Sequence, residues 1–495
     1  MKQTETYLKS VPLSLALLLG STLLFPLSAF AAKVCPPQLA GDAAVVPNSV
    51  EQADINSGAI EFEAIAEHGK NLFTAKFNRC DGSGRPETTG GGDARAVPTF
   101  SEEGEPIDAG QIEKLRTSAP DSDACAGCHN DPEAGAAGDF VANVFVLAQV
   151  LDPVTLSVSP LRSNDRNTLG MHGAGAIEML TREMTVDLKA QAAGKPDGWH
   201  TLTTKGVNFD IRKLGGVVVE TRGVDHDLVV KPFHQAGKVI SLREFSTNAM
   251  NHHHGMQPEE RFDLNPAKGY NPDFDNDGVT RELTIGDQTA ISVWQAQLDI
   301  PRQVMPNSSA DRAKVQHGEN VFGSIGCASC HKPALVLNTQ SFVEPNPFNP
   351  PGTCASAAQG CPNFSFDLTK ETGLEKGPGG TAVVRAYTDL KRHNLCDNPG
   401  PGAIRFFCNE KLAQGRPSQD GKPGTEFFLT RKLWDVGNSA PYGHRGDVSS
   451  ISEAILFHGG EGRASRDAFA ASSAANQKAL VMFLKSLQVV PDKID

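Results

Sequence analysis

The chain has 495 residues, of which 39% are hydrophobic and 21% are charged. This composition excludes a largely disordered chain and a protein with many membrane spans, and the length is sufficient for two large domains or about three smaller ones. The formal net charge of −12 at pH 7 argues against a nucleic-acid partner and permits a basic protein partner.

The N-terminus has the pattern of a cleaved export signal. An apolar run from Val11 to about Phe30 follows a lysine-containing start, and Ala29 and Ala31 form an A-x-A pattern. We therefore expect residues 1–31 to be a signal peptide and the protein to be periplasmic. An uncleaved membrane anchor is the alternative, because the apolar run is nearly long enough to span a bilayer.

The pattern Cys-x-x-Cys-His occurs twice, at residues 125–129 and 327–331. Chance would produce roughly 0.006 copies in a chain of this composition. Two thiols at this spacing can bond to the two vinyl groups of one haem, and the adjacent histidine then binds the iron. Zinc would need a further Cys or His pair nearby, which neither copy has. The sequence therefore predicts two covalently bound haem c groups.

Each predicted haem has two attachment cysteines and one proximal histidine. These residues are Cys125, Cys128 and His129 in the first copy, and Cys327, Cys330 and His331 in the second.

The segment before the second copy predicts a helix that begins near Ser308 or Ser309, because apolar residues recur on one face from Val315 to Ile325. Residues 467–488 predict one further helix, with an apolar stripe that includes Leu480 and Leu484. An entry helix, a CxxCH turn, a long loop and a closing helix are the outline of a cytochrome c domain.

Residues 232–245 (PFHQAGKVISLREF) align without gaps on residues 441–454 (PYGHRGDVSSISEA). The offset of 209 residues is close to the 202 residues that separate the two CxxCH patterns. Both halves therefore carry the same parts in the same order. We predict a mainly α fold with two cytochrome c-like haem domains in tandem, at residues 32–300 and 301–495.

The remaining segments predict a small β insertion and long loops. Residues 206–233 alternate and are rich in valine, which favours a β-hairpin. Residues 338–364 are rich in proline and predict a surface loop tied by a disulfide, and residues 90–110 predict another loop.

Six cysteines lie outside the CxxCH patterns, and in an oxidising compartment they predict three disulfides. About 15 pairings are possible. Proximity in the sequence favours Cys354–Cys361 and Cys396–Cys408, which leaves Cys35–Cys80.

The two CxxCH patterns, together with LWDVGNSAPYGHRGDVSSISEAILFHGGEG at 433–462 and SLREFSTNAMNHHHGMQPEERF at 241–262, resemble the bacterial di-haem oxidoreductases. That family is related to di-haem cytochrome c peroxidase and to the enzyme that matures methylamine dehydrogenase. The resemblance implies two haems with divided roles: one passes electrons, and the other reacts with peroxide or a similar small-molecule oxidant. It also implies a small redox protein as electron donor.

The resemblance also suggests catalytic carboxylates. In the peroxidase relatives, a glutamate after a Gly-x-x-x-Leu segment works beside the haem that binds peroxide, and Glu244 matches that position. A carboxylate suits this role because cleavage of a peroxide needs a proton moved between its oxygens. A capping or salt-bridging glutamate is the alternative, since Glu453 repeats the position in the other half. Glu178 is the second catalytic candidate.

The resemblance further suggests distal iron ligands. The relatives place a methionine a few residues after the repeated glutamate of the second domain, and here that place holds His458. Ligation by two histidines gives a lower potential than ligation by His and Met. For the first haem, the relatives' distal histidine soon after CxxCH has no counterpart. The candidates in its place are His172, His252, His253 and His254.

Asp273, Asp275, Asp277 and Gly278 match the first half of an EF-hand calcium loop, but its twelfth position holds Thr284 instead of glutamate. Calcium binding and a solvated acidic turn both stay open. For the whole protein, the sequence predicts an exported, peroxidase-like di-haem oxidoreductase. A di-haem electron carrier without small-molecule chemistry is the alternative, because the same motifs serve both.

Overall fold

The computed structural model describes residues 30–84, 122–139, 141–143, 165–262, 273, 277–357, 360–408 and 427–491. Most of the predicted signal peptide, the predicted loop at 90–110 and Asp275 lie outside the described residues. Within the described ranges, no helix has the length and apolar character needed to cross a membrane.

Helices carry most of the regular structure of the described residues. They are α1 (Gln52–Ser57), α2 (Phe62–Thr74), α5 (Ala174–Ala193), α6 (Leu242–His253), α7 (Glu259–Phe262), α8 (Ile285–Gln297), α9 (Ser309–Ser324), α10 (Leu368–Glu371), α11 (Ile451–Leu456), α12 (Arg463–Ala471) and α13 (Ala474–Lys485).

The strands are short and form small antiparallel sheets of two or three strands. They are β1 (Phe30–Ala32), β2 (Asn48–Val50), β3 (Val141–Asn143), β4 (Asp165–Asn167), β5 (Gly198–Thr204), β6 (Val207–Leu214), β7 (Val217–Arg222), β8 (Arg302–Gln303), β9 (Leu335–Leu337), β10 (Ser341–Glu344), β11 (Phe364–Asp367), β12 (Glu375–Lys376), β13 (Ala382–Val384), β14 (Arg392–Asn394), β15 (Phe427–Leu429) and β16 (Leu487–Gln488).

Two helix pairs, α2 with α8 and α9 with α13, are packed through the same kind of contact. A Cβ atom on Gly69 of α2 would overlap the carbonyl oxygen of Ala290 in α8, and one on Gly318 of α9 would overlap that of Ala479 in α13. Only glycine permits so close an approach of two helices. The two glycines lie in matching segments, HGKNLF at 68–73 and HGENVF at 317–322.

The predicted helix before the second CxxCH pattern is confirmed as α9. The Ser308 side chain accepts a hydrogen bond from the backbone N–H of Asp311, which satisfies one of the free donors of the first turn. The expected apolar face, including Val315 and Val321, is buried.

The two aligned segments 232–245 and 441–454 adopt the same local structure. Each contains an isolated antiparallel bridge, Phe233 with Val239 and Tyr442 with Val448. Each then leads to a helix whose capping serine accepts from the backbone N–H three residues later, Ser241 before α6 and Ser450 before α11. The repeat read from the sequence is therefore also a repeat of backbone structure.

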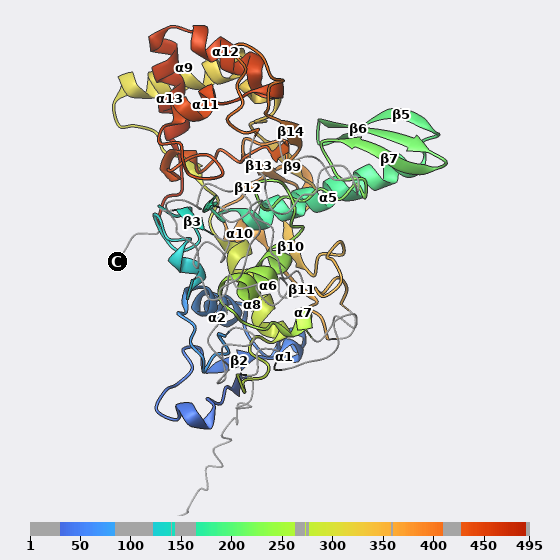
Figure 1. Cartoon of the computed structure of the whole chain (residues 1–495), viewed down its shortest axis with the longest axis vertical. Helices are drawn as coiled ribbons and strands as arrows, with labels where there is room; N and C mark the ends of the chain where they lie inside the picture. The colour runs from blue at the N-terminus through green and yellow to red at the C-terminus, as the bar shows by residue number, and fades with distance from the viewer. Residues whose placement is uncertain are drawn as a thin grey trace, which may run out of the picture.

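Helix α5 runs across the middle of the molecule, with α9, α11, α12 and α13 on one side and α2, α6 and α8 on the other (Figure 1). The predicted β insertion is present as the three-stranded sheet β5-β6-β7, which projects beside the end of α5 (Figure 1). Its inner face buries Leu202, Phe209 and Ile211.

The largest hydrophobic core contains residues from before and after residue 300. Ile177 and Leu180 of α5 belong to the same buried cluster as Phe342, Val384 and Trp434. The division into domains near residue 300 stays a prediction.

Two expectations about local structure are wrong. The helix predicted over 467–488 is two helices, because Ser472 and Ser473 are extended and the Ser473 side chain caps α13 by accepting from Asn476 N–H. The segment 338–364 is not wholly a surface loop: it contains β10, and Glu344 and Asn346 are each only 1% exposed.

All three predicted disulfides are present. They are Cys35–Cys80, Cys354–Cys361 and Cys396–Cys408.

Candidate haem-binding sites

The first CxxCH pattern forms a tight turn around the 3₁₀ helix Cys125–Gly127. The backbone N–H groups of Cys128 and His129 both donate to the carbonyl oxygen of Cys125, at 3.1 and 3.0 Å. Burial, with the nearby His253 adding to the effect, lowers the pKa of His129 to about 4. The imidazole of His129 is therefore neutral at pH 7, which is the form that binds a metal.

The second CxxCH pattern forms the same turn. The backbone N–H of His331 donates to the carbonyl oxygen of Cys327 at 3.0 Å. The Nδ1 atom of His331 lies 3.1 Å from both the Tyr387 and Arg431 carbonyl oxygens. A histidine that donates from Nδ1 presents an unprotonated Nε2, and such a donation is typical of histidines that bind metals.

The four cysteines of these turns are outside the disulfides. Burial raises the pKa of Cys125 to about 12, with Cys128 nearby adding to the effect, and burial raises the pKa of Cys327 to about 11. A redox dithiol or a zinc site needs a thiolate, which lies in surroundings that lower the pKa. Cys125 and Cys327 therefore lack the surroundings of a reactive redox dithiol, and all four cysteines are available for thioether bonds to haem.

His458 lies close to the second turn. Its Nδ1 atom is 2.7 Å from the Ala454 carbonyl oxygen, one helical turn earlier, and burial lowers its pKa. Burial, with the nearby His458 adding to the effect, also lowers the pKa of His331 to about 4. The structure thus brings together His331 and His458, which are 127 positions apart in the sequence.

Two of the candidate histidines lie close to the first turn. The Nδ1 atom of His254 is 2.7 Å from the Ser122 carbonyl oxygen, and its Nε2 atom is 3.2 Å from the sulfur of Cys125. His253 contributes to the low pKa of both His129 and His254. The first turn therefore has two neighbouring histidines at the end of α6, whereas His458 follows α11 alone.

The other two candidates are different. His172 is 2% exposed, and its Nδ1 atom lies 3.1 Å from the Asp299 carbonyl oxygen while its Nε2 atom lies 3.4 Å from Glu133. Both ring nitrogens thus already have polar neighbours. The side chain of His252 lies outside the described part of the structure.

An aromatic ring from the entry helix packs near each CxxCH histidine. The ring centroid of Phe73 is 6.0 Å from that of His129 and 4.4 Å from that of Trp294. The Phe322 centroid is 6.5 Å from that of His331. Phe73 and Phe322 end the matching HGKNLF and HGENVF segments. This second internal repeat could have been found by self-comparison of the sequence, and it was missed.

Glu244 lies at the start of α6 and has a local structural role. Its backbone N–H donates to the Ser241 hydroxyl at 2.9 Å, and its carboxylate accepts from the backbone N–H of Ile240 at 2.6 Å. The side chain is half-buried, and burial raises its pKa. The group therefore caps a helix end and also holds a proton more readily than a solvated glutamate does.

Glu178 is fully buried in α5. Its carboxylate accepts from the backbone N–H of Leu242 at 2.8 Å and from the side-chain amide of Asn346 at 3.0 Å. Burial, together with the neighbouring Glu344, raises the pKa of Glu178 to about 8. Glu178 therefore holds a proton near neutral pH.

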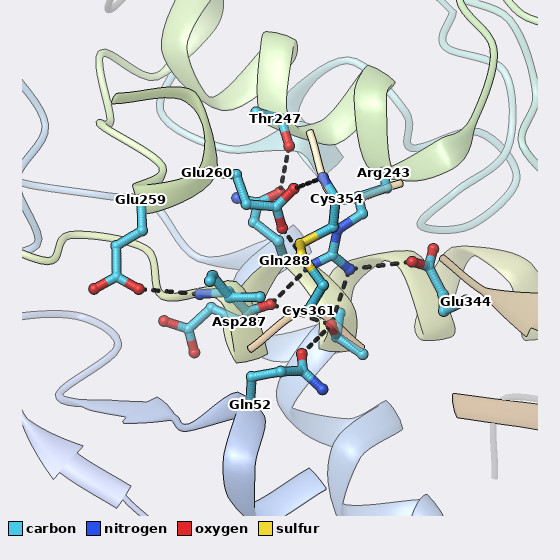
Figure 2. Close-up of polar contacts among 12 residues, drawn as sticks. Gln52, Arg243, Thr247, Glu259, Glu260, Asp287, Gln288, Glu344, Cys354 and Cys361 are labelled. Carbon is cyan, nitrogen blue, oxygen red and sulfur yellow. Dashed lines mark hydrogen bonds and ion pairs between the residues drawn. A yellow bond between two sulfur atoms is a disulfide. The ribbon is translucent and has the colours of Figure 1, made fainter. Parts of the chain in front are cut away.

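Glu344 also belongs to a buried ion cluster around Arg243, which Figure 2 shows. The Arg243 guanidinium contacts Glu260 and lies 3.2 Å from Glu344 and 2.9 Å from the Thr289 hydroxyl. Glu260 in turn accepts from the backbone N–H of Cys354 at 2.9 Å. The cluster joins α6 to α7, α8, β10 and the disulfide loop, and so anchors the helix that ends in the histidine run.

The carboxylates of Asp273 and Asp277 accept backbone hydrogen bonds. Asp273 accepts from the N–H groups of Asp277 and Gly278, and Asp277 accepts from Val279. Burial, with the nearby Asp273 adding to the effect, raises the pKa of Asp277 to about 6. Calcium binding here stays a prediction.

The cluster of polar side chains around His393 was not predicted from the sequence. In the described part of the chain, Cys330, Asp389 and His393 are the one set of three metal-ligand side chains whose atoms lie within 4.8 Å of one another. His393 also contacts Glu461, which stands three residues after His458. That position of Glu461 was the available clue.

A family model and a number of solved structures match this chain, and two of the structures are described here. Residues 360–487 match the family described as "Di-haem oxidoreductase, putative peroxidase". A hydrazine synthase from Kuenenia stuttgartiensis, pressurised with 20 bar xenon, aligns at 11% identity over 97% of this chain and 100% of its own, with a TM-score of 0.34. A MauG-like protein associated with microbial copper homeostasis aligns at 15% identity over 81% of this chain and 94% of its own, with a TM-score of 0.29. No curated protein matches the sequence.

Neither TM-score is high enough to define the fold of this chain. The family match includes Asp389, His393, Glu453 and His458, and both CxxCH turns lie outside it. For residues 360–487, about a quarter of the chain, this match confirms the resemblance to the di-haem oxidoreductases.

Proposed function

We propose that the protein is an exported, peroxidase-like oxidoreductase that carries two covalently bound haem c groups. The observation that carries this proposal is the pairing at each CxxCH turn. His129 and His331 are half-buried and neutral, and each has a second histidine close by at the end of a capped helix of the internal repeat or just after it.

The matching order of parts supports two cytochrome c-like domains in tandem. Each half has an entry helix with a glycine contact, a CxxCH turn, a repeated loop with a capped helix, and a closing helix. In the first half the helices are α2, α6 and α8, and in the second they are α9, α11 and α13. Residues 32–300 lie outside the family match, so the proposed first domain is supported by this internal correspondence alone.

The residues present fit haem as a bound group. Cys125 and Cys128 would hold the first haem and Cys327 and Cys330 the second, with His129 and His331 as proximal ligands. A bound haem supplies an iron that changes oxidation state and that can bind a small oxidant where a coordination position is open.

The protein's own groups would supply ligands and protons. His458 is the distal ligand that we propose for the second haem, whereas the first haem would keep one coordination position open, with His253 and His254 close to it. Glu244 would hold and move a proton, because its raised pKa brings it nearer to neutral pH, where a general acid or base works best. Its hydrogen bond from Ile240 N–H would keep the carboxylate in one orientation. Glu178 is the second proton carrier to test.

The electron-carrier function keeps support from one observation. Histidines lie near both CxxCH histidines, so all axial positions could be filled by protein side chains. In that case neither haem would offer an open position to an oxidant, and the protein would only pass electrons between partners.

One set of measurements on the purified mature protein distinguishes the two functions. We expect two haems per chain that resist acid-acetone extraction, one high-spin component in the resting spectrum, and oxidation of a ferrous small redox protein that depends on hydrogen peroxide. Six-coordinate low-spin iron throughout, with no peroxide turnover, would favour the electron carrier. Haem that is extracted by acid-acetone would contradict both functions. Recovery from the periplasmic fraction without residues 1–31 would test export.

A further inference from the structure

His393 lies on β14, between two carboxylates and beside the second CxxCH turn. Its Nε2 atom is 2.9 Å from a carboxylate oxygen of Asp389, and its Nδ1 atom is 2.7 Å from one of Glu461. The sulfur of Cys330 lies 3.9 Å from the same Nδ1 atom. His393 is 8% exposed and Asp389 is 2% exposed, whereas the side chain of Glu461 is 48% exposed.

This geometry requires a charged imidazole. A carboxylate only accepts hydrogen bonds, so an imidazole with a carboxylate at each nitrogen must donate from both, and only the protonated ring can do so. Burial alone would disfavour that charge, but hydrogen bonds to Asp389, Cys330 and Glu461 outweigh it and raise the pKa of His393 to about 11. His393 is therefore cationic at neutral pH.

The contacts of His393 join two segments that surround the second site. Cys330 directly precedes His331, and Glu461 stands three residues after His458. The second oxygen of Glu461 accepts from the backbone N–H of Asn394 at 2.9 Å, so this carboxylate binds β14 twice. The segment that carries His458 is thus attached to the strand that contacts the CxxCH turn.

A metal ion is the competing occupant of this group. Cys330, Asp389 and His393 could together supply three ligand atoms. A metal ligand needs an unprotonated imidazole nitrogen and a thiolate. Both nitrogens of His393 are used in donation, and thioether attachment of haem would remove the thiol of Cys330. The ion-pair arrangement is therefore the better account.

We propose that His393 is a positioning residue for the second haem: it fixes Glu461, and with it the His458 segment, and it places a positive charge beside the Cys330 attachment. This inference rests on the proposed function. A positive charge near the iron favours the reduced state, because oxidation adds positive charge to the site. His393 would therefore raise the midpoint potential of the second haem, and Asp389 would lower it.

The test is a redox titration at pH 7 of the full-length mature protein and its variants, followed by absorbance. We expect His393→Gln to lower the midpoint potential of the second haem and Asp389→Asn to raise it. His393→Lys should keep most of the wild-type potential, because it keeps the charge. The matched control is His317→Gln on the exposed face of α9. The His317 Nε2 atom lies 2.8 Å from the side-chain oxygen of Asn476, and this variant should leave both potentials unchanged.

Glu461→Gln provides a milder variant, since this side chain is half-exposed and its removal should not prevent folding. We expect a smaller rise in potential and a change in the low-spin absorbance of the second haem. Equal potentials in all variants, or a shift in the same direction for His393→Gln and Asp389→Asn, would overturn the role of His393 while the two haems per chain remain. Absence of haem from the wild type would instead contradict the proposed function and this inference together.

Discussion

The aligned segments 232–245 and 441–454 share a backbone design, but their glutamates lie in different surroundings. Glu244 is half-buried, accepts a backbone hydrogen bond, and has its pKa raised by burial. Glu453 is exposed, and hydrogen bonds from the Ser450 and Ser449 hydroxyls lower its pKa. The serine cap is therefore common to both halves, whereas a carboxylate whose pKa is raised by burial belongs to Glu244.

The surroundings of the two CxxCH turns differ in a related way. His253 and His254 lie close to the first turn, at the end of the twelve-residue helix α6. His458 lies close to the second turn, after the six-residue helix α11. A longer helix in the first half thus carries its histidines farther along the chain from the common capping serine. The duplicated parts have diverged where they meet the predicted haems.

The largest expected effect tests whether both halves hold a haem. We expect Cys125→Ala with Cys128→Ala, and separately Cys327→Ala with Cys330→Ala, to leave one haem per chain instead of two. Each variant should keep the spectrum of the other half, because the attachments are independent covalent bonds. The measurement is haem content by the pyridine haemochrome method. A pair of substitutions that leaves two haems would show that the corresponding turn is not an attachment site.

The next effect concerns the ligands that distinguish the halves. We expect His458→Gly to convert the second haem from low-spin to high-spin, because removal of its proposed distal ligand opens a coordination position. At the first haem, His253→Gly and His254→Gly should both keep the high-spin signal, because we expect that iron to have an open position; a signal that becomes high-spin in only one of these variants would identify that histidine as a ligand in the resting protein. Absorbance and electron paramagnetic resonance would measure the spin states, and an unchanged second haem in His458→Gly would remove that ligand assignment.

A smaller effect separates the two repeated glutamates. We expect Glu244→Gln to reduce peroxide turnover by about 10² to 10⁴-fold, or roughly 3 to 5 kcal/mol of barrier, because glutamine keeps the shape but cannot transfer a proton. Glu453→Gln is the matched control and should leave turnover unchanged. Steady-state oxidation of a ferrous donor provides the measurement. Equal rates for wild type and Glu244→Gln would direct the same test to Glu178→Gln.

The smallest effect is on stability and concerns Glu178. Its pKa is raised from 4.5 to about 8 in the folded protein, so the folded state binds this proton more tightly than the unfolded state does. Its stabilising contribution is complete below about pH 4.5 and is lost as the pH rises through about 8. Glu178→Gln should reduce the change in the free energy of unfolding with pH by on the order of a few kcal/mol.

Urea unfolding at pH 5 and pH 8 would measure the change for wild type, Glu178→Gln and Glu453→Gln. The last variant should retain the wild-type dependence, because Glu453 is exposed. An identical loss of stability between pH 5 and pH 8 in wild type and Glu178→Gln would show that Glu178 is not the group that titrates.

Features that depend on neighbouring residues were predictable from the sequence. The CxxCH turns, the Ser308 cap of α9 and the Cys354–Cys361 disulfide each depend on atoms a few residues apart, where spacing alone limits the geometry. The internal repeat was predictable for a different reason: two segments with the same residues at the same spacing fold into the same bridge and cap.

Features that depend on burial were decided by the tertiary structure. His393 meets Glu461 across 68 residues, and Arg243 meets Glu344 across 101. No local pattern identifies such partners, because an ionised group is stable in the interior only where packing brings opposite charges and hydrogen-bond partners to it. The same reason distinguishes Glu244 from Glu453. The two residues align in the sequence, and only the packing around each carboxylate determines which one has a raised pKa.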